Sequence, residues 1–243
     1  MQHYHLNTIS STNDYAKELL ETEPLVAVSA DHQSAGRGRK NKIWFGNFGD
    51  NLYLSIGIDH SKVKVKSNLV LYQAIGCLAV KKSIEALTKL KSLRIKYPND
   101  LMVRFGENRK KICGVLAEHS FIGQDCQNTV IGIGVNIRQK EFPAEISDTA
   151  ISLLNLGYDI QLNDMTSVLI SDLDFYLKKS SNELMRIWKK ELNIENKSAI
   201  IVGEEGSYFV KRLMEDGQLK LVNTKTDDIR IINNGDSIRY DLD

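Results

Sequence analysis

Short apolar runs rich in β-branched residues alternate with segments of helical spacing along most of the chain. Residues 25–31 (LVAVSAD) and 52–59 (LYLSIGID) are predicted strands, and residues 68–89 predict a mostly buried helix. Three more strands are predicted in LRIKYPNDLMVR, FGENRKKICGVLAEHS and TVIGIGVNI, and helical spacing appears at 149–156, 163–179 and 182–192. This mixed order predicts an α/β or α+β sheet covered by helices.

The last part of the chain, from about Lys197, changes to shorter alternating strands. The predicted strands AIIVG, SYFVKRLM, QLKLVN and IRIIN are separated by turn residues at Gly203, Asp216–Gly217 and Asn234–Gly235. A small β-barrel of roughly 45 residues is the simplest interpretation, and a unit of that size buries little core unless it packs on its neighbour. We therefore predict two domains, residues 1–195 and 196–243, with a tight boundary.

Charge and cysteine content limit the partners and the compartment. The 243 residues include 32 Lys and Arg against 31 Asp and Glu, a formal net charge of +1, which argues against a protein that binds DNA chiefly by neutralising phosphates. The three cysteines, Cys77, Cys113 and Cys126, have neither disulfide-framework nor zinc-binding spacing. The first residues do not resemble a signal peptide, and no run approaches the roughly 18 apolar residues that span a bilayer. We predict a cytoplasmic protein with neither a membrane nor a DNA partner.

A long stretch without periodicity, HQSAGRGRKNKIWFGNFGDN (32–51), separates two of the predicted strands. Loops of this length are usually functional or disordered. Residues 36–42 combine two glycines with four cations; the glycines let backbone N–H groups approach an anion, and the cations offset its charge. A solvated basic turn is the alternative interpretation. Trp44 and Phe45 are predicted to anchor the far end of the loop in the core.

Two further clusters carry residue types suited to chemistry. Residues 96–100 (KYPND) place an amide and a carboxylate at a strand end, as a site handling ribose, metal or a proton requires, although an ordinary turn has the same composition. Residues 110–118 (KKICGVLAE) place Lys111 at the mouth of an apolar strand, where a lysine is often merely solvated, and Gly114 where a ligand could approach. Cys113 has no histidine in its motif and is predicted to be a buried apolar group.

The N-terminal segment holds a predicted helix and two histidines. Ser11 or Ser10 is expected to cap a helix in SSTNDYAKELLE. His3 and His5 alternate on one predicted strand face, but the sequence offers no third ligand for a metal ion.

Six motifs, taken together and in this order, resemble the catalytic domain of biotin protein ligases. They are SSTN (10–13), HQSAGRGR (32–39), WFGNFGDNLYLS (44–55), KYPNDL (96–101), KKICGVLAE (110–118) and VIGIGVNI (130–137). The resemblance covers roughly the first 140 residues, and a small β-domain at the end is compatible with it. It implies an α+β fold with a mixed sheet flanked by helices, like class II aminoacyl-tRNA synthetases and biotin–lipoate ligases, followed by a C-terminal SH3-like β-barrel.

The resemblance implies a two-step, ATP-dependent reaction. Biotin and ATP, with Mg²⁺, give biotinyl-5′-AMP and pyrophosphate, and biotin then passes to one lysine of a biotin carboxyl carrier protein. Two alternatives stay open: a lipoate protein ligase on the same scaffold, and a protein that binds biotin without chemistry. The biotin-type motifs disfavour the first, and Lys111, Asp100 and Arg39 disfavour the second. The oligomeric state stays open, and a homodimer is compatible with the sequence.

Residue roles follow from the same resemblance. The expected catalytic residues are Lys111, Asp100 and Arg39; Asp100 would position either metal or the incoming amine, and no metal ligand set is assigned. The expected biotin-binding residues are Ser11, Thr12, Asn13, Gln33, Gly36, Arg37, Gly38, Arg39, Lys111 and Gly114. The expected ATP-binding residues are Arg37, Arg39, Lys42, Trp44, Lys96, Asn99, Asp100, Lys111 and Asn136.

Some positions depart from the family pattern. Tyr97 stands where Trp is usual and adds a hydroxyl that needs a partner, and Lys42 stands where Arg is common and lacks the bidentate fork toward phosphate. The aromatic residue that closes over adenine in some members is not clearly placed in this sequence, and Phe142 is a weak candidate for it. Members that repress transcription carry a helix-turn-helix domain ahead of SSTN; ten residues precede Ser11, so we expect the enzyme without the repressor domain.

Overall fold

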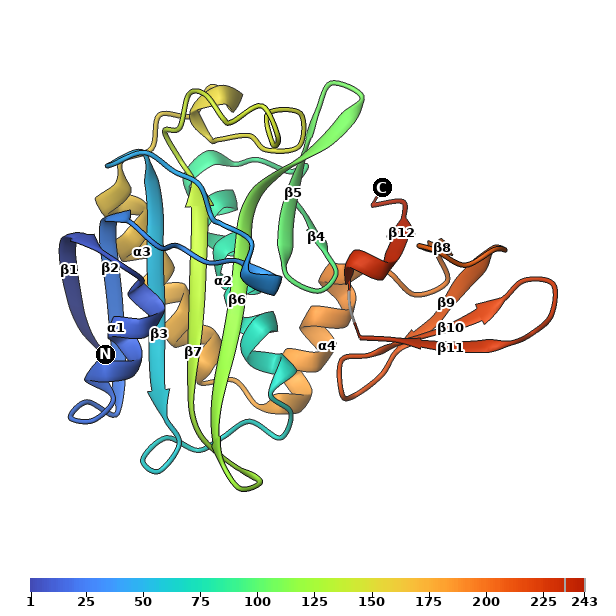
Figure 1. Cartoon of the computed structure of the whole chain (residues 1–243), viewed down its shortest axis with the longest axis horizontal. Helices are drawn as coiled ribbons and strands as arrows, with labels where there is room; N and C mark the ends of the chain where they lie inside the picture. The colour runs from blue at the N-terminus through green and yellow to red at the C-terminus, as the bar shows by residue number, and fades with distance from the viewer. Residues whose placement is uncertain (234, 243) are drawn as a thin grey trace.

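The larger of the two sheets is mixed and has seven strands. The computed structural model describes residues 1–233 and 235–242. The strands are β1 (Gln2–Ile9), β2 (Leu25–Gln33), β3 (Asn51–Asp59), β4 (Arg94–Lys96), β5 (Asp100–Phe105), β6 (Asn108–Ile122) and β7 (Asp125–Asn136), in the order β1-β2-β3-β7-β6-β5-β4 (Figure 1). β1 runs parallel to β2, and the other neighbouring pairs are antiparallel. The predicted α+β class with a mixed sheet is confirmed.

Helices cover both faces of this sheet, which explains its continuous apolar strands. α2 (Val70–Thr88), α3 (Leu162–Leu177) and α4 (Ser181–Leu192) lie on one face, and the short α1 (Thr12–Leu19) lies on the other (Figure 1). Strand β2 serves both layers: Val26 and Val28 pack with Ala16 of α1, whereas Ala27 belongs to the core under the long helices. A strand that is buried on two faces needs apolar residues at successive positions.

Helix α1 begins where the sequence predicted its cap. The Ser11 side chain accepts a hydrogen bond from the backbone N–H of Asp14, with an oxygen–nitrogen distance of 3.3 Å. This bond satisfies one of the free N–H groups of the first turn. The cap holds Ser11, Thr12 and Asn13 at the sheet surface, and all three side chains are buried.

A second, antiparallel sheet follows α4. Its strands are β8 (Ser198–Ile201), β9 (Tyr208–Leu213), β10 (Leu219–Asn223), β11 (Ile229–Ile232) and β12 (Ile238–Tyr240), in the order β11-β10-β9-β8-β12. The sequence predicted the first four and missed β12. Asn234 of the expected Asn234–Gly235 turn, and Asp243 at the end of the expected domain, lie outside the described residues. The boundary between residues 195 and 196 stays a prediction; it falls between the end of α4 and the start of β8.

Tyr97 connects the two sheets. Its hydroxyl donates to the backbone oxygen of Gly217 at 2.9 Å, and its backbone N–H donates to the Tyr240 hydroxyl at 2.8 Å. Burial raises the pKa of Tyr97 to about 12, so the hydroxyl keeps its proton and remains a donor. The partner that this hydroxyl required therefore comes from the turn between β9 and β10.

The helix predicted at 149–156 is wrong. Only a single 3₁₀ turn, Leu154–Leu156, forms there. The backbone N–H of Ile151 donates to the oxygen of Lys111, and the N–H of Lys111 donates to the oxygen of Thr149. These bonds pair the segment with β6 and prevent a helix. Ile151 is nevertheless buried, so the apolar residues whose spacing predicted a helix fill the core from a non-helical backbone. Within the described ranges, none of the helices is both long and apolar enough to cross a bilayer.

Candidate functional site

A cavity of about 240 Å³ lies between the loop after β2 and the sheet face that carries α1. It gathers most of the predicted site residues, although they are spread over more than a hundred positions. Those that line it are Ser11, Thr12, Asn13, Gln33, Arg37, Gly38, Arg39, Lys42, Trp44, Asn99, Asp100, Lys111, Gly114 and Asn136. Two predicted residues do not line it. Gly36 is buried, with its backbone oxygen accepting from the N–H of Trp44, and Lys96 lies on the edge strand β4.

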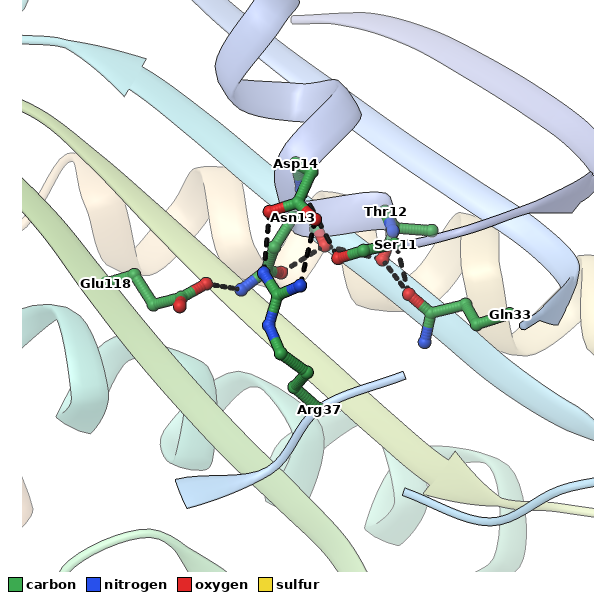
Figure 2. Close-up of polar contacts among 8 residues, drawn as sticks. Ser11, Thr12, Asn13, Asp14, Gln33, Arg37 and Glu118 are labelled. Atoms are coloured by element: carbon green, nitrogen blue, oxygen red, sulfur yellow. Dashed lines mark hydrogen bonds and ion pairs between the residues drawn. The ribbon is translucent and has the colours of Figure 1, made fainter. Parts of the chain in front are cut away.

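Neutral hydrogen-bonding groups line the part of the cavity next to α1 (Figure 2). The side-chain oxygen of Gln33 accepts from the backbone N–H of Thr12 at 2.7 Å and lies 3.0 Å from the Thr12 hydroxyl. These contacts fix the direction of the Gln33 carboxamide and turn its nitrogen away from Thr12. The arrangement suits an uncharged polar ligand group, because nothing there would leave a buried charge unpaired.

The glycine-rich loop, residues 36–42, forms a backbone hydrogen bond within itself and an ion pair with α1. The N–H of Gly38 donates to the oxygen of Lys42 at 2.7 Å. The Arg37 guanidinium donates two hydrogen bonds to the Asp14 carboxylate, at 2.6 and 2.9 Å (Figure 2). These bonds hold the pKa of Asp14 below its usual range. Arg37 is therefore engaged by a carboxylate, and its charge is already partly offset before any ligand binds.

Lys111 and Asp100 face each other on β6 and β5. The Nζ atom of Lys111 lies 2.7 Å from a carboxylate oxygen of Asp100 and 5.1 Å from the centre of the Trp44 ring. Next to Asp100, the Asn99 side chain donates to the backbone oxygen of Val115 at 2.9 Å and accepts from Arg39 at 3.2 Å. The cationic side chains of Lys111 and Arg39 thus lie beside the carboxylate of Asp100 and the amide of Asn99.

Trp44 fits over the sheet because two neighbouring positions are glycine. An added Cβ at Gly114 or Gly134 would collide with its ring. Trp44 is half-buried and lines the cavity, so it lies against the sheet but not within the core as predicted. The prediction of a core position is wrong for Phe45 too, which is 38% exposed and also lines the cavity.

The remaining wall comes from residues that the sequence did not select or selected only weakly. Phe142, Ile146, Thr149, Ala150 and Asp236 line the cavity. Asp236 follows the second sheet's β11 and forms an ion pair with Lys40 at 3.0 Å; the hydrogen bond from Lys40 lowers the pKa of Asp236. No local signal marks Asp236, because only the folded chain brings residue 236 to the loop.

Other chemistry-bearing residues have structural partners. Cys113 is fully buried, and burial raises the pKa of its thiol, as the predicted apolar role requires. His3 and His5 both hydrogen-bond the Ser29 hydroxyl, at 2.8 and 2.9 Å. Among residues 1–233 and 235–242, no three His, Cys, Asp or Glu side chains are grouped so that they could hold a metal ion.

Comparison with known families identifies the larger sheet and its site. Residues 6–136, more than half of the chain, match the model of the biotin/lipoate A/B protein ligase family. The chain belongs to this family. The family match contains the motifs from SSTN to VIGIGVN, so it covers the cavity residues of α1, the glycine-rich loop, β5, β6 and β7.

Members of the biotin/lipoate A/B protein ligase family resemble this chain over different lengths. The bifunctional ligase/repressor BirA of Escherichia coli is 29% identical over 216 residues, which are 85% of this chain and 64% of BirA. The biotin–[acetyl-CoA-carboxylase] ligase of Mycobacterium tuberculosis is 36% identical over 134 residues, 54% of this chain and 46% of that protein. The solved biotin protein ligase of Aquifex aeolicus, in complex with biotin and ATP, has a TM-score of 0.78 at 26% identity and covers 99% of both chains.

Proposed function

We propose that this family member is an ATP-dependent biotin protein ligase. The observation that carries the proposal is the composition of the cavity: neutral donors and acceptors at α1, and Lys111, Asp100, Asn99 and Arg39 together at β5 and β6. The first part suits the ureido ring of biotin. The second suits the place where a carboxylate meets a phosphate. The complex of the Aquifex aeolicus ligase with biotin and ATP supports the same substrates here.

In the first half-reaction, a carboxylate oxygen of biotin attacks the α-phosphorus of ATP. A new P–O bond forms, the bond to the leaving pyrophosphate breaks, and biotinyl-5′-AMP results. Both partners are anionic, so the site must supply fixed positive charge where the transition state gains negative charge. Lys111 and Arg39 supply this charge, and Lys42 lies on the same loop for the outer phosphates. Asn136 and Trp44 are proposed to lie against the nucleotide.

In the second half-reaction, the amine of an acceptor lysine attacks the acyl carbon of the adenylate. The C–N bond forms, AMP leaves with the electrons of the C–O bond, and the amine loses a proton. The partly exposed carboxylate of Asp100 lies 2.7 Å from the Nζ atom of Lys111 and can orient the incoming amine or accept its proton. The acceptor is proposed to be a biotin carboxyl carrier protein, in a cytoplasmic reaction that the free cysteines permit.

Magnesium is proposed as a companion of ATP and not as a resident ion. Mg²⁺ usually binds through one or two carboxylates together with substrate phosphates. The cavity offers the carboxylate of Asp100 and the amide oxygen of Asn99, and both already have cationic neighbours in Lys111 and Arg39. This donor set fits an ion held mainly by phosphate oxygens. When bound there, the ion would offset phosphate charge.

Pyrophosphate release measured in three separate reactions, with biotin, with lipoate and with neither, tests the proposal. Release that depends on biotin, followed by biotin transfer to a carrier-protein lysine, is expected. Release with lipoate alone would assign the chain to lipoate ligation. Biotin binding without release would make the protein a binder without chemistry. The absence of both binding and release would overturn the proposal.

A further inference from the structure

Gln139 follows β7 and is fully buried, although it lies in none of the six motifs and does not line the cavity. A buried carboxamide needs hydrogen-bond partners at both its oxygen and its nitrogen. Its Oε1 accepts from the backbone N–H of Asn47 at 3.0 Å and from the Asn51 side-chain nitrogen at 3.1 Å. Its Nε2 donates to the backbone oxygen of Glu141 at 2.6 Å. One side chain therefore joins the segment that leads into β3 to the segment that follows β7.

Backbone groups fix which way the Gln139 carboxamide faces. The N–H of Asn47 can only donate and the carbonyl oxygen of Glu141 can only accept, so the amide oxygen must face the first and the amide nitrogen the second. Asn51 is oriented in the same way, because its side-chain oxygen accepts from the backbone N–H of Ile137 at 3.1 Å and leaves its nitrogen for Gln139. Each of these hydrogen bonds therefore has a single possible direction.

The two joined segments carry two walls of the cavity. The first, which we call the loop wall, is Trp44 and Phe45, where the chain leaves the glycine-rich loop. The second, which we call the far wall, consists of Phe142, Ile146, Thr149 and Ala150. Gln139 contacts the chain three residues after Trp44 and one residue before Phe142. A single carboxamide thus sets the position of one wall relative to the other.

Close packing leaves this link little freedom. An added Cβ at Gly46 would collide with the Asn51 side-chain nitrogen and the Tyr53 hydroxyl, so the backbone next to the loop wall lies directly on the network. At its other end the far wall is held by β6, because the N–H of Lys111 donates to the oxygen of Thr149 at 2.7 Å. Tightly packed interiors transmit a displacement instead of absorbing it. A change in the position of one wall therefore reaches the other through the buried carboxamide.

We propose that Gln139 is a positioning residue that couples the two walls, so that biotin and ATP strengthen each other's binding. This inference rests on the proposed function, since it takes biotin and ATP as the two ligands. The loop wall continues the glycine-rich loop, which is paired with α1 at the end proposed for biotin. The far wall adjoins Lys111, where the nucleotide is proposed to react. A ligand that fixes one wall leaves the other better ordered for the second ligand, by the same factor whichever binds first.

Calorimetry measures this coupling directly. The Kd of biotin is measured without and with a saturating ATP analogue that has a methylene bridge between the α- and β-phosphates and cannot release pyrophosphate. The ratio of the two Kd values is the coupling factor, and in wild type we expect about 5 to 150, the usual range for coupled sites. Gln139→Met keeps the side-chain length and removes the hydrogen bonds to both walls. Its factor should fall to about 1 or 2, because the walls then respond separately.

Gln139→Asn is a second variant that breaks the same link. It keeps an amide but is one methylene shorter, so it cannot reach Asn47 and Glu141 together, and its factor should also fall. Ser83→Ala is the control for lost stability, since it removes a buried hydrogen bond to Asp172 between α2 and α3. It should lower the melting temperature and keep the wild-type factor. Gln124→Met, in the exposed turn between β6 and β7, should change neither.

Each result decides between explanations. A wild-type factor in both Gln139 variants would overturn this inference and leave the proposed function intact. A fall of the same size in Ser83→Ala would also overturn it, because any loss of stability would then have the effect. A factor near 1 in wild-type protein would show that the walls act independently. Failure of wild-type protein to bind biotin would instead refute the proposed function, and this inference would fall with it.

Discussion

The Nζ atom of Lys111 and a carboxylate oxygen of Asp100 lie 2.7 Å apart on neighbouring strands. Both side chains are partly exposed to the cavity, at 33% and 25%, so the pair is open to a ligand. An anionic phosphate would compete with Asp100 for the lysine, and an amine would compete with Lys111 for the carboxylate. The same two residues can therefore serve successive half-reactions.

Loss of the Lys111 charge should slow adenylation. Lys111→Ala removes a positioned cation from the developing negative charge, and we expect kcat/KM for biotin-dependent pyrophosphate release to fall by roughly 10² or more. Lys110→Ala is the matched control, since Lys110 donates to the Ser147 backbone oxygen at the surface. A Lys111→Ala rate within about threefold of wild type would contradict the assignment.

Arg39→Gly should weaken retention of the adenylate more than its formation. The guanidinium of Arg39 is held by Asn99 beside the reacting centre, and its loss removes a charge-assisted contact worth about 1.5–3 kcal/mol. We expect the adenylate to be retained roughly 10 to 100 times less well. Single-turnover adenylate formation and biotin labelling of an unrelated protein measure the two effects. Lys91→Gly, in an exposed loop, is the control. Unchanged bystander labelling would reassign Arg39 to ATP binding.

Asp14 should restrain the glycine-rich loop in the absence of ligand. Asp14→Asn replaces the bidentate ion pair with Arg37, and we expect trypsin to cut faster after Arg37, Arg39 or Lys42. Biotin with ATP should slow cleavage in both forms, because a bound anion offsets the clustered charge of the loop. Asp164→Asn, in the first turn of α3, is a matched control. Equal cleavage with and without ligands would show that the loop does not close over them.

Two histidines should make the fold less stable in mild acid. His60 and His119 share the Thr129 hydroxyl, at 2.8 and 2.9 Å, and burial lowers the pKa of each below its ordinary value. The unfolded chain therefore binds protons more readily, and the free energy of unfolding falls as the pH drops through and below about 6.5.

Urea unfolding at pH 7.5 and 5.5 measures this loss. The midpoint should be lower at pH 5.5, and the combined variant His60→Gln, His119→Gln should show a smaller pH difference. His32→Gln serves as the control for removal of a histidine elsewhere. An equal pH difference in wild type and the combined variant would place the acid-sensitive group outside this pair.

The sequence predicted strands best where both faces are buried. Every residue of β3 from Asn51 to Ile58 is buried, so its apolar run carried a strong signal. The prediction failed where tertiary contacts decide the backbone. Ala150, Ile151 and Leu153 are apolar and fit a helix face, but the backbone hydrogen bonds of Thr149 and Ile151 to Lys111 pair the segment with β6 instead. Strand β12 has three residues, too few for a periodic pattern.

The sequence predicted those site residues that lie within recognisable motifs. Motifs placed Thr12, Gln33, Arg39, Asp100 and Lys111, all of which line one cavity. Motif matching could not show that Gly36 is buried, or that Arg37 is engaged by Asp14. Asn13 of α1 donates to Glu118 of β6, and the two residues meet because both elements contact β7. Such pairings are set by the whole sheet and leave no local trace.

The bonds from Tyr97 to Gly217 and Tyr240 make the chain hard to divide. Cutting it near residue 195 and removing the second sheet would strip the partners from Tyr97, which directly precedes Pro98, Asn99 and Asp100. It would also take Asp236 out of the cavity wall. A chimera that exchanges second sheets between relatives should therefore carry residues 97, 217 and 240 from the same parent.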